Sequence, residues 1–364
     1  MHVCLRCDAG PGYGFGHLMR CVALAQALRR RGEPPALFLV RRLGVEAVYA
    51  RLVTAQGFAL QYLEEHEAGL AFDLGRFVTP DQPGLFVFDC YDVTPAQMDG
   101  FAQAGHFVAA IDDLADRRFN ARLVLNQNLG AAGLAYDAPG AALLLGPRYV
   151  LLREAFLKPR PVAPLEQAPR LFMSFGGGDV FERVRRLVGM FSRLDPALPG
   201  PVEVDLALPD NPAQTARYRE AVAGCVNFRF RFVVGELDLA GVMSRASVAL
   251  TAGGSSVFEL ARLGVAQLVV IIDANQRVTA ELVEAAGLGR LLGAAADIAF
   301  EDFSAALLRL LADAPAGRAM AAEGRALMDG QGADRAAAVL CAIWRGEDWT
   351  RHAQGDDDGY SRFS

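Results

Sequence analysis

The chain has 364 residues, of which 52% are hydrophobic, and its formal net charge is -6. This length and apolar content are enough for two domains with separate cores. The dispersed basic residues argue against nucleic acid and against an anionic membrane surface as partners. No apolar run approaches the roughly 20 residues that a membrane-spanning helix needs, and residues 1–10 lack a signal-peptide pattern. We therefore expect a cytoplasmic protein without stable membrane insertion.

Strand-like runs alternate with helix-like segments along the whole chain. Strands that are apolar on both faces and separated by helices are typical of parallel sheets covered on both sides. In the first half we expect strands at residues 2–7, 35–40, 85–88, 106–111, 121–126 and 142–146, with helices such as 17–32 and 94–104 between them. In the second half we expect strands at residues 171–175, 202–208, 227–232, 247–252 and 267–272.

A proline-rich stretch at residues 158–169 divides the chain. It holds four prolines in twelve residues and no apolar periodicity, so it is predicted to be a linker. We expect an N-terminal α/β domain over 1–157, a C-terminal α/β domain over 170–345 and a mobile polar tail over 346–364. The predicted fold class is α/β, with two doubly wound, Rossmann-like domains that face each other across a ligand-binding cleft.

Six cysteines stand at positions 4, 7, 21, 90, 225 and 341. Cys4 and Cys7 form a C-x-x-C pair, but no second pair completes the four ligands of a structural zinc site. The pair also lies in or at the end of a strand, whereas a redox pair would open a helix. We expect reduced structural thiols and no metal.

The first candidate site is the glycine-rich loop after the first predicted strand. Gly12, Gly14 and Gly16 permit positive φ and a close approach of backbone to a ligand. His17 follows at the start of a helix, where the helix dipole disfavours imidazolium and leaves a neutral ring that can accept a proton near pH 7. The spacing does not match the dinucleotide fingerprint G-x-G-x-x-G. A tight turn with a capping histidine is the alternative.

A G-G-S-S-V-F-E stretch in the second half indicates a nucleotide site. Gly253 and Gly254 end a strand, and Ser255 and Ser256 open a helix whose free N–H groups and dipole can bind phosphate. Glu259 falls one turn later on the face of Ser255. A carboxylate there repels phosphate but can bind two vicinal hydroxyls, so the pattern fits a nucleoside diphosphate with its ribose. A capped helix with a solvated glutamate is the alternative.

Two weaker candidates occur in the same half. Gly176 and Gly177 belong to a triple glycine that suits backbone contact with a ligand but is also common in flexible turns. Asn275 and Gln276 follow a strand and carry amides that donate and accept hydrogen bonds, as sugar hydroxyls and N-acetyl groups require. An asparagine near a helix start is also a common cap.

Carboxylates end two strands of the first half. Asp89 and Asp92 flank Tyr91 after one strand, and Asp112 and Asp113 follow another. Paired carboxylates can bind a metal, but no histidine or third cluster accompanies them. We expect both pairs to cap turns.

Together these stretches resemble one family, the UDP-sugar hydrolases of pseudaminic acid biosynthesis. The segments that carry the resemblance occur in order from about residue 5 to 336: RCDAGPGYGFGHLMRCVALAQAL, FDCYDV, IDDLADRRFNARLVLNQNLG, LLLGPRYVLLREAF, SFGGGD, TAGGSSVFELARLG, ANQ and MDGQGADR. The G-G-S…E pattern alone is shared across GT-B enzymes, and its combination with the other segments is far more specific. The resemblance implies the two-domain GT-B fold, related to the glycosyltransferase that makes bacterial lipid II. It also implies hydrolysis of UDP-2,4-diacetamido-2,4,6-trideoxy-β-L-altropyranose to the free sugar and UDP.

The resemblance also implies roles for individual residues. His17 would activate the attacking water, Tyr91 would line the sugar site, and Asn275 would contact the substrate near the reacting centre. Three residues of the second-half helix would hold pyrophosphate and ribose: Ser255, Ser256 and Glu259. The implied partners are a UDP-activated diacetamido-trideoxy sugar and water, with no metal and no other cofactor. The sequence does not indicate whether the protein is a monomer or an oligomer.

The chain departs from the family pattern at Gly178, Val180 and Ala266, where Ser, Pro and Pro are commoner; these positions concern the phosphate side and leave His17 unchanged. The expected mechanism is displacement with inversion at the anomeric carbon, in which His17 takes a proton from water on the face opposite UDP. The alternatives are a GT-B glycosyltransferase that uses a UDP-amino sugar, a hydrolase of a related UDP-diacetamido sugar, and a non-catalytic nucleotide-sugar binding protein.

Overall fold

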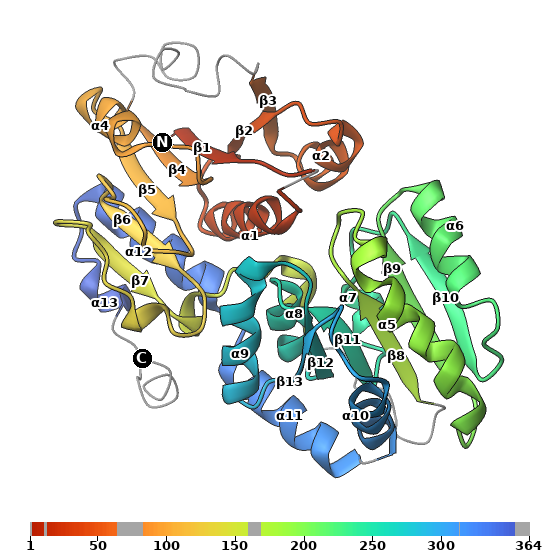
Figure 1. Ribbon diagram of the computed structural model, residues 1–364. Coiled ribbons are helices and arrows are strands. Elements are labelled where there is room, and N and C mark those ends of the chain that lie inside the picture. The colour runs from red at the N-terminus through yellow and green to blue at the C-terminus, as the bar shows by residue number, and fades with distance from the viewer. Residues whose placement is uncertain (1, 11–12, 64–82, 159–168, 313, 354–364) are drawn as a thin grey trace. The chain divides into compact units, whose positions relative to one another are not determined.

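The computed structural model forms two compact units (Figure 1). Unit 1 comprises Met1–Glu154 and Gly330–Ser364, and unit 2 comprises Ala155–Asp329. The structure describes residues 2–10, 13–63, 83–158, 169–312 and 314–353. Within these ranges, no helix combines the length and the apolar character that crossing a membrane requires.

Unit 1 contains a seven-stranded parallel sheet in the order β3-β2-β1-β4-β5-β6-β7. Its strands are β1 (His2–Cys7), β2 (Leu37–Arg41), β3 (Ala59–Leu63), β4 (Gly84–Asp89), β5 (Phe107–Ile111), β6 (Leu123–Asn126) and β7 (Ala142–Leu145). Its helices are α1 (Gly16–Arg30), α2 (Glu46–Leu52), α4 (Pro95–Gln103), α12 (Gly332–Arg345) and α13 (Thr350–Ala353). The central strands β4 and β5 are buried along their whole length, because helices cover both faces of a parallel sheet.

Unit 2 contains a six-stranded parallel sheet in the order β10-β9-β8-β11-β12-β13. Its strands are β8 (Arg170–Ser174), β9 (Val202–Leu208), β10 (Phe228–Val234), β11 (Val248–Ala252), β12 (Ala266–Ile271) and β13 (Arg290–Ala294). Its helices are α5 (Phe181–Leu194), α6 (Pro212–Ala221), α7 (Ala240–Met243), α8 (Ser256–Leu263), α9 (Arg277–Ala285), α10 (Phe300–Ala312) and α11 (Ala314–Leu327).

Helix α5 shows how the sequence builds the core of unit 2. Val184, Leu187, Val188 and Phe191 recur at helical spacing and are all buried. The ring of Phe191 packs edge-on against Phe303 of α10, with 5.2 Å between the ring centroids. An apolar stripe at this spacing, with arginines on the opposite face, fixes which side of α5 meets the sheet.

Both sheets reverse their strand order beside their first strand. In unit 1 β1 lies next to β4, and in unit 2 β8 lies next to β11. Doubly wound sheets bind ligands at the carboxyl ends of the strands at such a switch point. The loop after β1 carries His17, and the loop after β11 carries the G-G-S-S stretch, so each unit presents its candidate residues at this point.

The predicted fold class is confirmed, since each unit is a doubly wound, parallel α/β sheet. The predicted strands all form, and within the described ranges two further strands, β3 and β13, were not predicted from the sequence. Both missed strands lie at a sheet edge.

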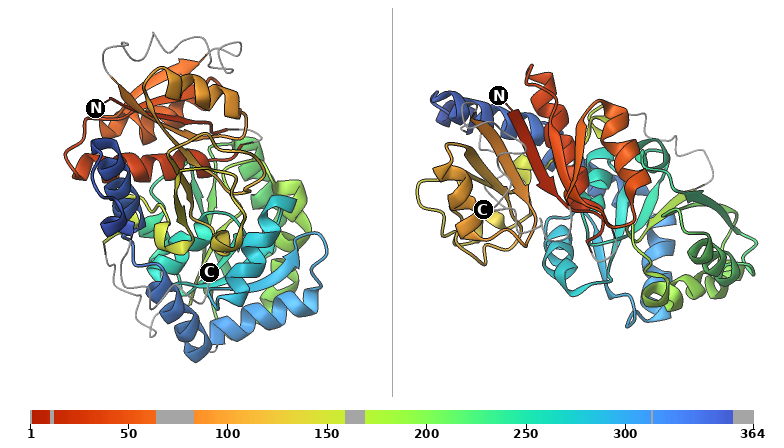
Figure 2. Two further views of the ribbon diagram at one scale, coloured as in Figure 1. Left: turned by 90° about the vertical axis from the view of Figure 1, so that its left-hand side faces the viewer. Right: turned by 90° about the horizontal axis from the view of Figure 1, so that it is seen from above.

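The expected C-terminal domain boundary at residue 345 is wrong, because α12 belongs to unit 1. This helix packs against α1 (Figure 2). A Cβ at Gly332 would overlap the backbone of Val150, so only glycine allows the approach. Arg335 donates to the Arg148 carbonyl oxygen at 3.2 Å. These contacts return the chain to unit 1 after residue 329.

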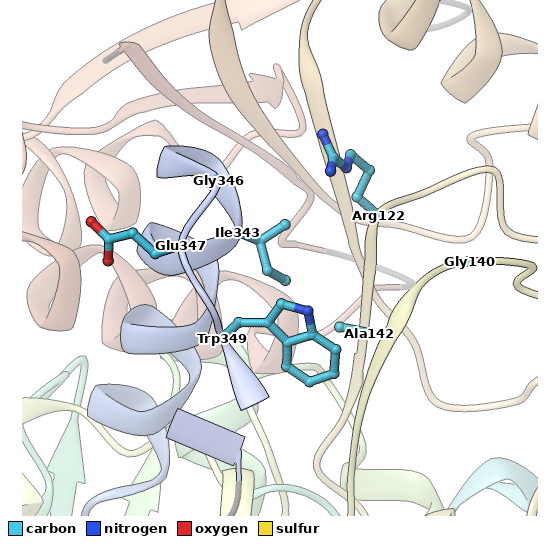
Figure 3. A pocket seen from close by; sticks show the side chains of 7 residues that line it. All are labelled: Arg122, Gly140, Ala142, Ile343, Gly346, Glu347 and Trp349. Carbon is cyan, nitrogen blue, oxygen red and sulfur yellow. The ribbon is translucent and has the colours of Figure 1, made fainter. Parts of the chain in front are cut away.

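The first part of the predicted tail contains regular structure. Residues 346–353 include α13, and Trp349 lines a hollow of about 230 Å³ with Arg122 and Ile343 (Figure 3). Residues 354–364 of the predicted tail, and 159–168 of the predicted linker, lie outside the described residues. All six cysteines are free thiols.

Candidate active site

Backbone bonds between Gly10 and Gly14 close the glycine-rich loop of unit 1. The N–H of Gly10 donates to the Gly14 carbonyl oxygen at 2.9 Å, and the N–H of Gly14 donates back to Gly10 at 2.9 Å. Gly14 has φ +70°, a conformation that favours glycine, and α1 begins two residues later at Gly16. Gly12 lies outside the described residues. The turn thus places His17 in the first turn of α1, as predicted.

His17 is held by a carboxylate at the end of β4. Its Nδ1 lies 2.6 Å from Oδ1 of Asp89, which is completely buried. Because Asp89 is ionised, Nδ1 must carry the hydrogen and donate it. The other ring nitrogen, Nε2, is then the hydrogen-bond acceptor of the ring. The arrangement has the geometry of a histidine base oriented by a carboxylate.

Arg20, one turn along α1 from His17, joins two carboxylates. Its Nε and Nη2 donate to both oxygens of Asp89, at 2.7 and 2.5 Å. Its Nη1 and Nη2 donate to both oxygens of Asp113, at 2.7 and 3.0 Å. Nη2 also lies 3.0 Å from Nδ1 of His17. Since both nitrogens carry hydrogens and share Oδ1 of Asp89, this contact joins two donors and is not a hydrogen bond.

Tyr91 and Asn128 complete the cluster around Asp113. The Tyr91 hydroxyl donates to Asp113 Oδ2 at 2.9 Å, and the Asn128 amide donates to Oδ1 at 2.7 Å. The Tyr91 ring stands edge-on to the His17 ring, with centroids 5.1 Å apart. We refer to six side chains as the His17 network: His17, Arg20, Asp89, Tyr91, Asp113 and Asn128.

Charge pairing sets the protonation of the network. Burial alone would raise the pKa of Asp89, but Arg20 and His17 outweigh burial and lower this pKa below its ordinary value. Arg20 likewise outweighs burial at Asp113 and lowers the pKa of that carboxyl. Partial burial, followed by the Asp113 charge, raises the pKa of the Tyr91 hydroxyl. Both carboxylates are therefore ionised near neutral pH, and Tyr91 keeps its proton.

All four strand-end carboxylates were expected to cap turns, but only one of them does. Asp89 and Asp113 belong to the His17 network, because Arg20 draws both inward. Asp112 does cap a turn, since its Oδ2 accepts two backbone N–H groups at 2.9 and 2.7 Å. Asp92 forms an ion pair with Arg41. Among the described residues, no group of three or more His, Cys, Asp or Glu side chains is arranged to hold a metal ion.

In unit 2 the G-G-S-S stretch adopts the predicted strand-to-helix geometry. Ser255 is the N-cap residue of α8, makes no side-chain capping bond and is exposed. The first N–H groups of a helix generally lack intrahelical partners and suit an anion. In α8 the N–H groups of Val257 and Phe258 already donate to the carbonyl oxygens of Gly254 and Ser255, both at 3.1 Å, which leaves the N–H groups of Ser255 and Ser256 for this role. Ser256 is the first residue of α8, and Glu259 lies in its first turn. Gly254 is half-buried beside them.

Gly253 allows the loop that carries Asn275 and Gln276 to pack closely against the G-G-S-S stretch. A Cβ at this position would lie 3.1 Å from both the Gln276 carbonyl oxygen and the Ala280 Cβ. The Gln276 side-chain oxygen accepts the Ile272 N–H at 2.9 Å, so it closes its own loop. Asn275, next to it, is exposed. The alternative was that Asn275 caps the helix start. Gln276 makes the local bond there instead.

The remaining glycine candidates follow β8. Gly176 has φ +100°, which a residue with a side chain rarely adopts, and it is exposed. Gly177 is half-buried. The carbonyl oxygen of the third glycine, Gly178, accepts from the Gln214 amide at 3.2 Å. This loop lies at the same switch point as the G-G-S-S stretch.

Arg20 and Asn128 belong to the site but were not predicted from the sequence. Arg20 stands three residues after His17, which places both on one helix face, and that spacing was the available signal. Asn128 follows β6 by two residues, so its signal was a polar side chain at a strand end.

Comparison with known proteins identifies the fold. No protein-family model matches the chain. The spore coat polysaccharide biosynthesis protein SpsG of Bacillus subtilis (strain 168) is 23% identical over 357 residues, which cover 95% of this chain and 100% of that protein.

Solved structures are similar over nearly the whole chain. MurG of Acinetobacter baumannii has a TM-score of 0.65 at 16% identity and covers 93% of this chain and 99% of its own. MnaA of S. aureus, solved with UDP, has a TM-score of 0.65 at 10% identity, over 95% and 97% of the two chains. The rhamnosyltransferase SpnG, complexed with thymidine diphosphate, has a TM-score of 0.59 at 20% identity, over 94% and 100%. The chain therefore has the GT-B fold.

Proposed function

We propose that the protein hydrolyses a UDP-sugar, with His17 as the general base that activates water. The observation that carries this proposal is the 2.6 Å bond from His17 Nδ1 to Asp89, which makes Nε2 the basic nitrogen. The sugar that the family resemblance implies is UDP-2,4-diacetamido-2,4,6-trideoxy-β-L-altropyranose. The reaction would serve pseudaminic acid biosynthesis for surface or flagellar glycosylation, in the cytoplasm.

The charge of the His17 network supports this role. Two ionised carboxylates surround one guanidinium, so the network carries one net negative charge while His17 is neutral. Protonation of His17 cancels that charge. The completely buried Asp89 carboxylate, 2.6 Å from Nδ1, lies where positive charge develops on the ring as the base accepts a proton.

The chemical step balances as a displacement at the anomeric carbon. A water proton passes to Nε2 of His17 as the water oxygen forms the new C1–O bond. The bond between C1 and the UDP oxygen breaks, and its electron pair leaves with UDP. The product sugar has inverted configuration, because water attacks the face opposite the leaving group. Tyr91, beside the His17 ring, would contact the sugar.

The two units suit different parts of the substrate. The net negative charge of the His17 network repels phosphate, so a neutral sugar ring is the fitting occupant in unit 1. The N-terminus of α8 in unit 2 suits the diphosphate, through backbone N–H groups and Ser255 and Ser256. Glu259 would bind the ribose hydroxyls, and Asn275 would contact the sugar. The glycines Gly176, Gly177, Gly253 and Gly254 would let backbone approach the nucleotide.

Transfer of the sugar to another acceptor is the second candidate function. The name of one structural neighbour favours it, since SpnG is called a rhamnosyltransferase. In that case Nε2 of His17 would take the proton of an acceptor hydroxyl instead of water. The two functions differ in whether UDP is released without an acceptor.

A single set of reactions tests the proposal. The protein is incubated with a panel of UDP-diacetamido sugars and no acceptor, and NMR follows UDP release and the anomer first formed. We expect steady UDP release and inversion for one substrate. In His17→Ala we expect turnover to fall by about 10²–10⁴-fold with UDP binding unchanged. His352→Ala, at an exposed histidine of α13, is the control. No release without an acceptor overturns hydrolysis, and full activity of His17→Ala overturns its role.

A further inference from the structure

A single arginine binds three backbone carbonyls of the segment that carries Tyr91. Nη1 of Arg117 donates to the carbonyl oxygens of Tyr91 at 2.7 Å and Val93 at 3.1 Å. Its Nη2 donates to the Cys90 carbonyl oxygen at 3.0 Å. One planar guanidinium thus fixes residues 90–93, immediately after β4. A lysine ammonium lacks the forked geometry that reaches all three acceptors.

Arg117 is itself held in place. Its guanidinium lies over the ring of Phe119, 5.3 Å from the centroid, and Phe119 is completely buried. Arg117 belongs to the segment after β5, in which Asp112 accepts the N–H groups of Leu114 and Ala115. The arginine therefore joins an ordered turn after β5 to the segment after β4.

The Tyr91 side chain depends on its backbone for its position. Tyr91 is 49% exposed, so packing leaves about half of the residue uncovered. The Tyr91 hydroxyl binds Asp113 and the Tyr91 ring contacts His17 edge-on. Both contacts require one orientation of the Cα–Cβ bond of Tyr91. A backbone clamp at residues 90–93 sets that direction.

We propose that Arg117 is a positioning residue for the reaction and acts through Tyr91, an inference that rests on the proposed function above. Without the clamp, Tyr91 loses its alignment with His17 and Asp113, and the reacting sugar loses its orientation. Misplacement of a positioning group by about 1 Å can cost up to ~10²-fold in rate. The effect falls on kcat more than on UDP binding, because the clamp lies in unit 1.

The experiment compares Arg117→Ala and Arg117→Lys with Arg118→Ala. Arg118 is the matched control, since it is exposed and its side chain donates to Asn120 at 3.0 Å. We expect kcat to fall about 10- to 100-fold in both Arg117 variants and to stay unchanged in Arg118→Ala. In a Tyr91→Ala background, Arg117→Ala should lower kcat no further, because coupled residues are not additive. An independent additional loss in that background overturns the proposal.

A second measurement does not depend on activity. The NMR ¹³C shifts of the Cys90, Tyr91 and Val93 carbonyls respond directly to the bonds that Arg117 donates. They should move upfield in Arg117→Ala and stay unchanged in Arg118→Ala, and added guanidinium ion should restore both the shifts and turnover. Equal carbonyl shifts in the two variants overturn the clamp. Absence of turnover in the unchanged protein refutes the proposed function instead, while the carbonyl shifts still decide the clamp. If Arg117→Ala does not fold, Arg117→Lys carries the same comparison.

Discussion

At the scale of residues, the site depends on one guanidinium that separates two carboxylates. Asp89 and Asp113 would repel each other in the interior of unit 1 without Arg20 between them. Breaking a buried ion pair on one side leaves a charge without compensation, which costs more than the pair contributes when intact. Arg20 therefore compensates both carboxylates and holds Asp89 where Asp89 binds Nδ1 of His17.

This pairing predicts a pH-dependent stability. The pKa of Asp113 is lowered in the folded protein, so the unfolded chain takes up protons at higher pH than the folded one. The carboxylate therefore stabilises the fold fully above about pH 4, and this contribution is lost as pH falls through the folded-state pKa. Asp113→Asn should lower the free energy of unfolding by about 3 kcal/mol at neutral pH, and by less as acid is added. Urea denaturation across pH measures this.

The control for that prediction is Asp116→Asn. Asp116 is exposed and close to Asp113 in sequence. It should change the urea midpoint little at any pH. A destabilisation by Asp113→Asn that stays constant down to strong acid would contradict the ion-pair account.

The sequence predicted some of these residues and not their connections. His17 stood out because three glycines and a helix start surround it, and the structure places it in the first turn of α1. The bonds of Arg20 join positions 69 and 93 residues apart, and no local pattern encodes such pairs. Asp89 and Asp113 were therefore expected to cap turns, which is the commoner use of an aspartate at a strand end.

At the scale of elements, the strands that the sequence missed share one property. The exposed and half-exposed residues of β3 and β13 outnumber their buried ones, whereas the predicted strands β4, β11 and β12 are buried throughout. An edge strand has one neighbour instead of two, so its sequence need not be apolar on both faces. Continuous apolar runs therefore reveal the central strands of such a fold readily. The edge strand β10, of which only Phe228 is buried, was nevertheless predicted, so edge position lowers the signal without removing it.

Helix α12 offers a test of close packing at this scale. Gly332→Ala should lower the free energy of unfolding by about 1–3 kcal/mol, because the new Cβ overlaps the Val150 backbone. Gly189→Ala is the matched control, since Gly189 lies in the middle of α5 with no atom near a new Cβ. It should stabilise the protein by about 0.5–1 kcal/mol. Thermal or urea denaturation distinguishes the two, and equal effects would contradict the close approach of α12.

At the scale of the whole molecule, the proposed function divides the work between the units. Changes in the His17 network should alter turnover, and changes around α8 should alter nucleotide affinity. The GT-B fold alone does not decide this division, because one fold supports many activities. It follows from the charge of each site.

The ribose contact proposed for Glu259 tests this division. UDP should bind about tenfold or more tightly than 2′-deoxy-UDP, because a carboxylate accepts the 2′-hydroxyl hydrogen. Glu259→Ala should remove most of that difference, whereas His17→Ala should retain it. Isothermal titration calorimetry with both nucleotides gives the comparison. An equal preference in Glu259→Ala and the unchanged protein would refute the role of Glu259.

Unit 2 is an insertion within unit 1, because the chain leaves unit 1 at Glu154 and returns at Gly330. During translation, every strand of unit 1 therefore emerges from the ribosome before unit 2, and α12 emerges after it. At ordinary elongation rates, synthesis of unit 2 takes about ten seconds or more. During that time the surface of α1 that α12 later covers stays uncovered. The unit that holds His17 is thus the first to begin folding and the last to be completed.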